Sequence, residues 1–441
     1  TADFRWAHSV ALPQIARHAN QQEYAEAFAL AERVEQIVPQ DATLRELWSR
    51  ISSTLTISSS PPGADVALKP YRKIGDAWQR LGVTPLTNLR LPLGFYRWQF
   101  TKEGHAPIER AAGVGRTVPT FDVVLPIVGN VPAGMIAIPG SRRVQLNLAT
   151  LEHLPRPEVA AYHIDKFEVT NREFKAFVDA DGYANAAFWL HPLVDGQRTL
   201  TRAEAIGRFV DRTGRPGPAT WSNGTYPEGE AERPVTGVSW YEAAAYAASV
   251  NKRLPSVYHW SRAASGQFVE HIAPLSNFAN RELAAVGAHA GMSAWGAYDM
   301  AGNAKEWCTN EGDGGTRYLL GGSWRDPEYQ FTVADAQPPL DRGAANGFRC
   351  MAPVAGAPLL AELDALVIGV RRDFAVARPV NDEVFATLRD VYAYDKGPLD
   401  ARIEQEDDSD SRWHKSRVTV NAAYGSERLP LYLFRPRTLS P

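Results

Sequence analysis

The spacing of hydrophobic residues changes twice along this chain, near Leu55 and near Gly134. Before Leu55, apolar side chains recur every three or four residues, as on one face of a helix. From there to about residue 126 they alternate with polar ones, as in a half-buried strand. After Gly134 the helix and strand signals are local, and Gly, Pro, Trp and Asn are frequent. A length of 441 residues also exceeds what one core usually holds. We therefore predict several domains of the α+β class.

Residues 1–53 are predicted to form a helical hairpin. Pro39 to Asp41 separates two helical patterns, each with one apolar face. The faces consist of Tyr24, Phe28 and Ala31, and of Leu44, Leu47 and Trp48. The hairpin resembles a single tetratricopeptide-like unit. Because such units gain stability from stacked neighbours, a single one is expected to act as a spacer or a cap.

Residues 54–126 are predicted to form a small antiparallel β-sandwich. Alternating runs such as Tyr96 to Phe100 are separated by turn signals at Pro61 to Gly63, at Thr84-Pro85 and at Gly94. This order of strands and turns resembles a PEGA domain. The resemblance implies a surface-associated module without known catalysis, which serves as a spacer or contacts carbohydrate or cell wall.

Residues 131–353 carry three helix-start signals of one kind. In each, a Ser or Thr is followed three residues later by Glu, which forms a capping box. The pairs are Thr170 with Glu173, Thr201 with Glu204, and Ser239 with Glu242. We expect three short capped helices, with irregular loops between them that are held by aromatic side chains.

Residues 354–441 end in two alternating runs, from Arg417 to Ala423 and from Leu429 to Phe434. The turn-forming stretch from Tyr424 to Glu427 joins them, so a β-hairpin is predicted. This segment resembles the lead-in to an α/β-hydrolase. The G-x-S-x-G nucleophile elbow of that fold occurs nowhere in the sequence, so the hydrolase itself is not expected.

The overall charge argues against nucleic acid as a partner. The net charge is -3, and basic residues are interspersed with acidic ones rather than gathered in a stripe. No window approaches the roughly 18 apolar residues of a membrane span, so no membrane contact is expected from this segment itself.

The chain holds only two cysteines, Cys308 and Cys350. Two interpretations stay open for them: a disulfide bridge, or two reduced and buried thiols.

Short motifs from Gly134 to Cys350 together resemble one family, and their order is highly specific. They are GMIAIPG (134–140), IDKFEVTN (164–171), RPV (233–235), VSW (238–240), KRLPS (252–256), WGAYDMAGNAKEW (295–307), GGSW (321–324) and GFRC (347–350). They are similar to the formylglycine-generating, or sulfatase-modifying factor, domain family. The resemblance covers about half of the chain and implies a loop-rich α+β fold related to C-type lectins.

The same resemblance locates the positions of the family's two catalytic cysteines. In catalytic members this cysteine pair binds copper(I), a soft ion that prefers sulfur to oxygen ligands. The matching positions here hold Asp326 and Phe331. The sequence therefore predicts that no copper is bound and that formylglycine is not generated.

The resemblance also implies one calcium site in the loop from Asp299 to Glu306. Its ligands would be the side chains of Asp299 and Glu306 and the carbonyl groups of Gly302 and Ala304. Oxygen ligands of this kind suit Ca²⁺. The alternative is that both carboxylates cap turns or pair with basic side chains.

A ligand groove is expected where the family binds its substrate. Aromatic and charged residues would line its floor, and it would take a peptide, a glycan or a small molecule. The residues are Trp324, Arg325, Asp326, Tyr329 and Phe331. The alternative is that the aromatic side chains only fill the space of a lost metal site.

These features favour a non-catalytic, ligand-binding or sensory region, in other words a pseudoenzyme. One alternative is an active oxidoreductase of the same superfamily, and another is a fragment of a serine/threonine kinase polyprotein. The array resembles bacterial chains that also carry a kinase and a membrane anchor. An extracytoplasmic location is accordingly favoured over a cytoplasmic one.

Overall fold

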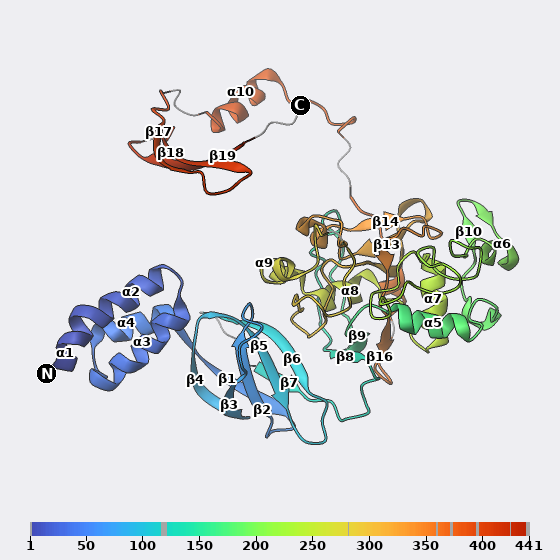
Figure 1. Cartoon of the computed structure of the whole chain (residues 1–441), viewed down its shortest axis with the longest axis horizontal. Helices are drawn as coiled ribbons and strands as arrows, with labels where there is room; N and C mark the ends of the chain where they lie inside the picture. Colours follow the sequence, from blue (N-terminus) through green and yellow to red (C-terminus); the bar gives the residue numbers. More distant parts are fainter. Residues whose placement is uncertain are drawn as a thin grey trace. The chain divides into compact units, whose positions relative to one another are not determined.

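The computed structural model describes residues 2–115, 121–280, 282–358, 360–370, 374–393, 397–423 and 425–437 (Figure 1). Its contacts divide the chain into two compact units, residues 1–371 and 372–441. The first unit contains helices at its start, a β-sandwich and a mixed domain with short helices and strands. The predicted α+β class is confirmed.

The N-terminal segment contains the two helices of the predicted hairpin and, before them, one further continuous helical stretch. Its elements are α1 (Ala2–Trp6), a π-helical turn (Ala7–Ala11), α2 (Leu12–Asn20), α3 (Tyr24–Ile37) and α4 (Ala42–Ile51). The first three follow one another without a break; the π-helical turn packs on α3, and α2 packs on both α3 and α4. The prediction of only two helices was wrong. The buried face of the first helical stretch is largely alanine, including Ala7, Ala11 and Ala19, and alanine gives a weak periodic signal in the sequence.

The β-sandwich consists of two antiparallel layers, one of which gains a parallel strand. The strands are β1 (Ser52–Ser60), β2 (Asp65–Pro70), β3 (Gln79–Val83), β4 (Leu86–Pro92), β5 (Gly94–Thr101), β6 (Ile108–Val114) and β7 (Phe121–Val124). One layer has the order β4-β1-β7 and the other β3-β2-β5-β6. Trp98 and Phe100 on β5 are fully buried between the layers, as the period-two pattern requires.

The mixed domain is built on two small sheets with the orders β16-β9-β8 and β14-β13-β12-β15, and it has a separate two-stranded sheet of β10 and β11. Its strands are β8 (Met135–Ile138), β9 (Tyr162–Asp165), β10 (Val194–Asp195), β11 (Arg198–Thr199), β12 (Lys305–Glu311), β13 (Arg317–Leu320), β14 (Asp335–Gln337), β15 (Asn346–Gly347) and β16 (Met351–Pro353). Its helices are α5 (Asn171–Asp179), α6 (Arg202–Ile206), α7 (Trp240–Ser249), α8 (Val257–Ala264) and α9 (Val269–Ile272).

All three predicted capping boxes are confirmed, at the starts of α5, α6 and α7. In each, the Ser or Thr side chain accepts from the backbone N–H of the Glu, and the Glu carboxylate accepts from the backbone N–H of the cap. These caps are local in sequence, so they form without help from distant residues.

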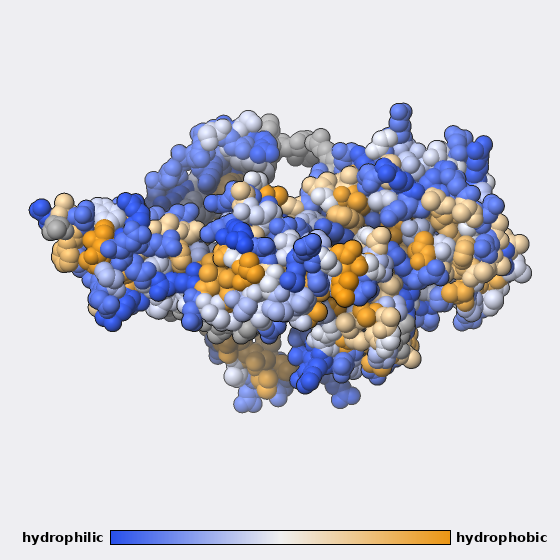
Figure 2. All heavy atoms as spheres, turned by 90° about the horizontal axis from the view of Figure 1, so that it is seen from below, coloured by the Kyte–Doolittle hydropathy of each residue, from blue (hydrophilic) through white to orange (hydrophobic). Residues whose placement is uncertain are grey.

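Apolar side chains are mostly interior in the mixed domain. Trp260 and Trp307 are fully buried, one in each of its two hydrophobic clusters. On the face drawn in Figure 2, hydrophobic side chains form separate small patches among hydrophilic ones. None of the helices in the described part of the chain has the length and apolar character that crossing a bilayer requires.

The second unit contains α10 (Asp382–Val391) and a three-stranded antiparallel sheet. Its strands are β17 (Arg402–Asp407), β18 (Trp413–Asn421) and β19 (Arg428–Pro436), in that order. The predicted hairpin is confirmed as β18 and β19, which pair from Trp413 with Pro436 to Asn421 with Arg428. The turn residue Tyr424 lies outside the described residues.

Buried polar contacts join the β-sandwich to the mixed domain. The Tyr71 hydroxyl donates to the carbonyl oxygen of Met292 over 2.7 Å and accepts from the Met292 N–H over 2.8 Å. The buried Arg97 guanidinium donates to the carbonyl oxygens of Tyr71 and Ala290. Main-chain groups that would otherwise be unpaired are thereby satisfied, which holds the two domains in one unit.

The variant Tyr71→Phe is expected to lower the free energy of unfolding by about 1–3 kcal/mol, because Met292 would lose partners for two buried main-chain groups. Urea unfolding followed by tryptophan fluorescence measures the change. The matched control is Tyr329→Phe, because Tyr329 is 64% exposed; this variant should stay within roughly 0.5 kcal/mol of wild type. Equal effects of the two variants would contradict the importance of this contact.

Candidate functional site

A buried ion pair lies at the centre of the mixed domain. Arg349, just before β16, donates through Nε and Nη2 to the two carboxylate oxygens of Glu306 on β12, over 2.8 and 2.6 Å. Both side chains are fully buried. The indole N–H of Trp260 on α8 donates to the same carboxylate over 2.8 Å. Glu306 therefore has three donors around it.

The remaining guanidinium hydrogens of Arg349 hold loops together. They reach the carbonyl oxygens of Asp165 at 3.0 Å, Lys166 at 3.2 Å and Tyr298 at 2.8 Å. These carbonyl groups belong to segments far apart in sequence. One side chain thus joins the end of β9, the loop before β12 and β12 itself, which fixes the backbone around the predicted calcium loop.

Two further carboxyl groups, those of Glu168 and Asp299, interact electrostatically with Glu306 and Arg349. Glu168 accepts from the N–H of Ala304 over 3.1 Å and from the side-chain amide of Asn303 over 3.3 Å. Burial, together with the negative charges of Asp299 and Glu306, raises the pKa of Glu168 well above its usual range. Burial raises the pKa of Asp299 to about 6. Sequence reasoning missed Glu168, although it lies within a quoted motif.

This arrangement offers Ca²⁺ hard oxygen ligands. Three buried carboxyl groups face one guanidinium, and even with Glu168 protonated the ionised Asp299 and Glu306 leave negative charge in excess at pH 7. Asp299 already accepts from the N–H of Gly287 over 2.6 Å, and Glu306 is held by Arg349. A carboxylate can accept about four bonds, so both keep room for a metal ion. Among the described residues, no three His, Cys, Asp or Glu side chains are placed to hold a metal by themselves, so backbone carbonyls would have to contribute.

The residues at the two positions of the family's cysteines have structural roles. Asp326 accepts through one oxygen from the N–H and the hydroxyl of Ser323, over 2.9 and 2.7 Å, and lies 3.5 Å from the ammonium of Lys305. Phe331 is 1% exposed and packs edge-on against Trp260, with ring centroids 6.2 Å apart. Asp326 thus stabilises a turn, and Phe331 belongs to the core.

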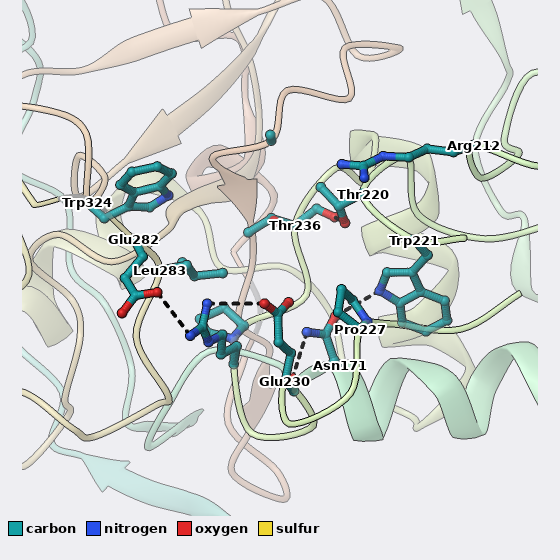
Figure 3. Close-up of a pocket in the computed structure, with 13 residues that line it drawn as sticks. Asn171, Arg212, Thr220, Trp221, Pro227, Glu230, Thr236, Glu282, Leu283 and Trp324 are labelled. Atoms are coloured by element: carbon teal, nitrogen blue, oxygen red, sulfur yellow. Dashed lines mark hydrogen bonds and ion pairs between the residues drawn. The ribbon is translucent and has the colours of Figure 1, made fainter. Parts of the chain in front are cut away.

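A cavity of about 260 Å³ opens beside Trp324. In Figure 3, Trp324 and Glu282 lie on one side, and Arg212, Thr220 and Trp221 on the other. Arg233 forms ion pairs with Glu230 at 3.2 Å and with Glu282 at 3.3 Å. The exposed Arg212 forms no ion pair among the described residues, so a positive charge is available at the rim of the cavity.

The five predicted groove residues are only partly brought together. Trp324 lines the cavity, and the guanidinium of Arg325 stacks on its ring at 4.5 Å. Tyr329 is largely exposed and does not line the cavity, and Phe331 is buried in the core. The residues on the opposite side come partly from the loop around Thr220, which carries no quoted motif. Others, such as Arg233 and Pro234, lie in the quoted RPV motif but were not assigned to the groove.

The two cysteines are free thiols. Cys308 on β12 and Cys350 are both buried, and they belong to different hydrophobic clusters. Of the two interpretations, the structure therefore has reduced buried thiols and not a bridge. Burial raises the pKa of both thiols well above the usual range, so both are protonated and unreactive at neutral pH.

Comparisons with known families agree with this architecture. Residues 129–354, just over half of the chain, match the family model for sulfatase-modifying factor enzyme 1-like domains. Residues 52–128 match the model for PEGA domains.

Curated relatives carry different names. The hercynine oxygenase of Mycobacterium tuberculosis is 32% identical over 169 residues, which cover 35% of this chain and 38% of that protein. The serine/threonine-protein kinase Pkn1 of Chlamydia trachomatis is 34% identical over 152 residues, covering 28% of this chain and 24% of the kinase. The formylglycine-generating enzyme of Thermomonospora curvata is 26% identical over 310 residues, covering 53% and 99%. The chain therefore spans about two fifths of the length of the hercynine oxygenase.

The variant Arg349→Met is expected to destabilise the mixed domain by about 3–5 kcal/mol, because the buried carboxylates would lose their cation. Thermal and urea unfolding measure the loss. The control is Lys175→Met, which removes an exposed pair with Asp179 and should cost no more than roughly 0.5 kcal/mol. A small effect of Arg349→Met would show that the pair is not needed.

Proposed function

The chain belongs to the family of sulfatase-modifying factor enzyme 1-like domains, and from that premise we propose that it binds a ligand in the cavity beside Trp324 without transforming it. The observation that carries the proposal is the state of the two cysteine positions. Asp326 is engaged by Ser323 and Lys305, and Phe331 is packed in the core. Neither side chain offers the sulfur that copper(I) prefers.

The chemistry of the cavity supports a small polar ligand group. Trp324 offers a flat apolar surface, and Arg212 offers a positive charge at the rim, whereas Trp221 lines the cavity but is only 1% exposed. A volume of about 260 Å³ is small for a drug-sized molecule and suits one side chain of a peptide, one sugar ring or a small molecule. In a chain that also carries a kinase, as the relative Pkn1 does by name, such binding would serve as a sensor input.

Oxygen consumption tests the non-catalytic part of this proposal. With copper(I), a thiol reductant and a cysteine-containing peptide, the wild-type protein is expected to consume no oxygen above the blank, because positions 326 and 331 lack thiolates. The matched control is the double variant Asp326→Cys with Phe331→Cys, which should gain copper(I) binding.

Peptide-dependent oxygen consumption by the wild-type protein would overturn the proposal and favour the alternative, an active oxidoreductase. The same measurement with iron(II) covers the second metal by which that alternative could act.

We also propose that one Ca²⁺ is bound through Asp299, Glu306 and the carbonyl oxygens of Gly302 and Ala304. Support comes from the buried carboxyl groups of Asp299, Glu306 and Glu168, which face a single guanidinium, and from the raised pKa of Glu168, which reflects the negative charges of the other two. Such an ion would stabilise the loop that leads into β12 and would have a structural role, because it lies among buried carboxylates.

Removal of calcium with EGTA is expected to lower the melting temperature, and added calcium to restore it. An ion at 100 times its Kd contributes about 2.7 kcal/mol. The variant Asp299→Asn should lose the calcium response, whereas Asp326→Asn should keep it. A wild-type melting temperature that is the same with EGTA and with calcium would exclude the ion.

A further inference from the structure

A second and larger cavity, of about 880 Å³, lies between the β-sandwich and the mixed domain. It shares no lining residue with the cavity beside Trp324. On the sandwich side it is lined by residues of β6 and β7, and on the other side by residues around β8, β9 and α8. Its volume falls in the range of sites for small organic ligands.

Most of the lining is apolar, with aliphatic and aromatic side chains. The apolar contributors include Ile108, Val123, Val124, Ile138, Phe268 and Val354. An apolar surface of this kind favours a hydrocarbon group over water, because transfer of the hydrocarbon out of water is favourable. The apolar lining therefore suits the hydrocarbon part of a ligand.

One part of the cavity wall is charged, because two guanidinium groups stack there on a single indole ring. The Cζ atoms of Arg110 and Arg262 lie 4.2 and 4.1 Å from the centroid of Trp295. Arg262 donates to the carbonyl oxygen of Pro139 at 3.3 Å. Arg110 has no ion pair and no side-chain hydrogen bond among the described residues. Burial and the neighbouring positive charge of Arg262 lower the pKa of Arg110 to about 10.

Two buried donors at this place lack acceptors. The Nε of Arg110 and the indole Nε1 of Trp295 are both out of contact with solvent and without a hydrogen-bond partner. A buried donor without an acceptor costs free energy, and an uncompensated charge costs more. Elsewhere in the same interface Arg97 is fully engaged by carbonyl oxygens and a tyrosine hydroxyl. The Nε atoms of Arg202 and Arg317 are also buried without a partner, but both guanidinium groups bond through their terminal nitrogens. Arg110 has no such bond among the described residues.

Other charged groups at the cavity do not neutralise the arginines. Asp122 is the acidic residue in the described lining; it is exposed and accepts from the Ser58 hydroxyl. No ion pair joins Asp122 to Arg110 or Arg262 within the described residues. His163 also lines the cavity, and burial lowers its pKa, which keeps it neutral at pH 7.

From this geometry we propose that the interdomain cavity binds an aliphatic carboxylate, with the carboxylate at Arg110, Arg262 and Trp295 and the hydrocarbon chain along the apolar walls. A carboxylate is flat and accepts two parallel N–H bonds, which matches the guanidinium fork. The ligand would satisfy both orphaned donors. It would contact both domains at once, so binding would also stabilise their association.

Titration calorimetry with dodecanoate, kept below its critical micelle concentration, tests the proposal on the full chain. Dodecanoate is expected to bind at least tenfold more tightly than 1-dodecanol, which has the same tail without charge, and acetate should not bind measurably. The variants Arg110→Gln and Arg262→Gln should each weaken dodecanoate binding about tenfold or more, which is the scale of one charge-assisted hydrogen bond.

The matched control is Arg90→Gln, which removes a guanidinium that stacks on Trp48 at 4.4 Å and does not line the cavity; dodecanoate affinity should not change. Ala161→Trp keeps both arginines and adds bulk at the cavity wall, so it should reduce binding as well.

The melting temperature without ligand separates a binding role from a structural one. Because the Nε of Arg110 is buried without an acceptor and its guanidinium group has no ion pair among the described residues, Arg110→Gln should leave that temperature unchanged or raise it. Equal affinity for dodecanoate and 1-dodecanol, no binding of either, or full retention of affinity in Arg110→Gln would each overturn the proposal. These outcomes do not depend on the cavity beside Trp324.

Discussion

The buried pair of Arg349 and Glu306 is the interaction on which the mixed domain depends. A domain with short strands and long loops has many main-chain carbonyl groups that no sheet satisfies. Arg349 supplies donors to three of them and to Glu306 at the same time. The cost of burying its charge is offset by complete pairing, which is the condition under which a buried ion pair is tolerated.

Four arginines of the first unit fall into two pairs. Arg349 and Arg97 are fully engaged by protein acceptors, and they hold segments or domains together. Arg110 and Arg262 line a cavity, and Arg110 lacks an acceptor. The difference is physical rather than compositional, because the same side chain is structural where acceptors surround it and available for a ligand where they do not.

Local signals were predicted well from the sequence, whereas the site was predicted only in part. Capping boxes and the hairpin of β18 and β19 depend on residues a few positions apart, so their patterns are sufficient. The first helical stretch, residues 2–20, was missed because its buried alanines give little contrast in hydrophobicity with the residues on its exposed face. Glu168 and Arg349 were not assigned to the site, since their partners lie far away in sequence.

The sequence by itself determined the class of fold, the order of domains and the loss of both thiols at positions 326 and 331, because these are written in short motifs and residue identities. Only the tertiary structure decided what the replacements do, since Asp326 turns to Ser323 and Phe331 enters the core. It alone brought Arg110, Arg262 and Trp295 together across two domains. Whether a charged side chain finds an acceptor depends on chain segments that only folding brings into contact.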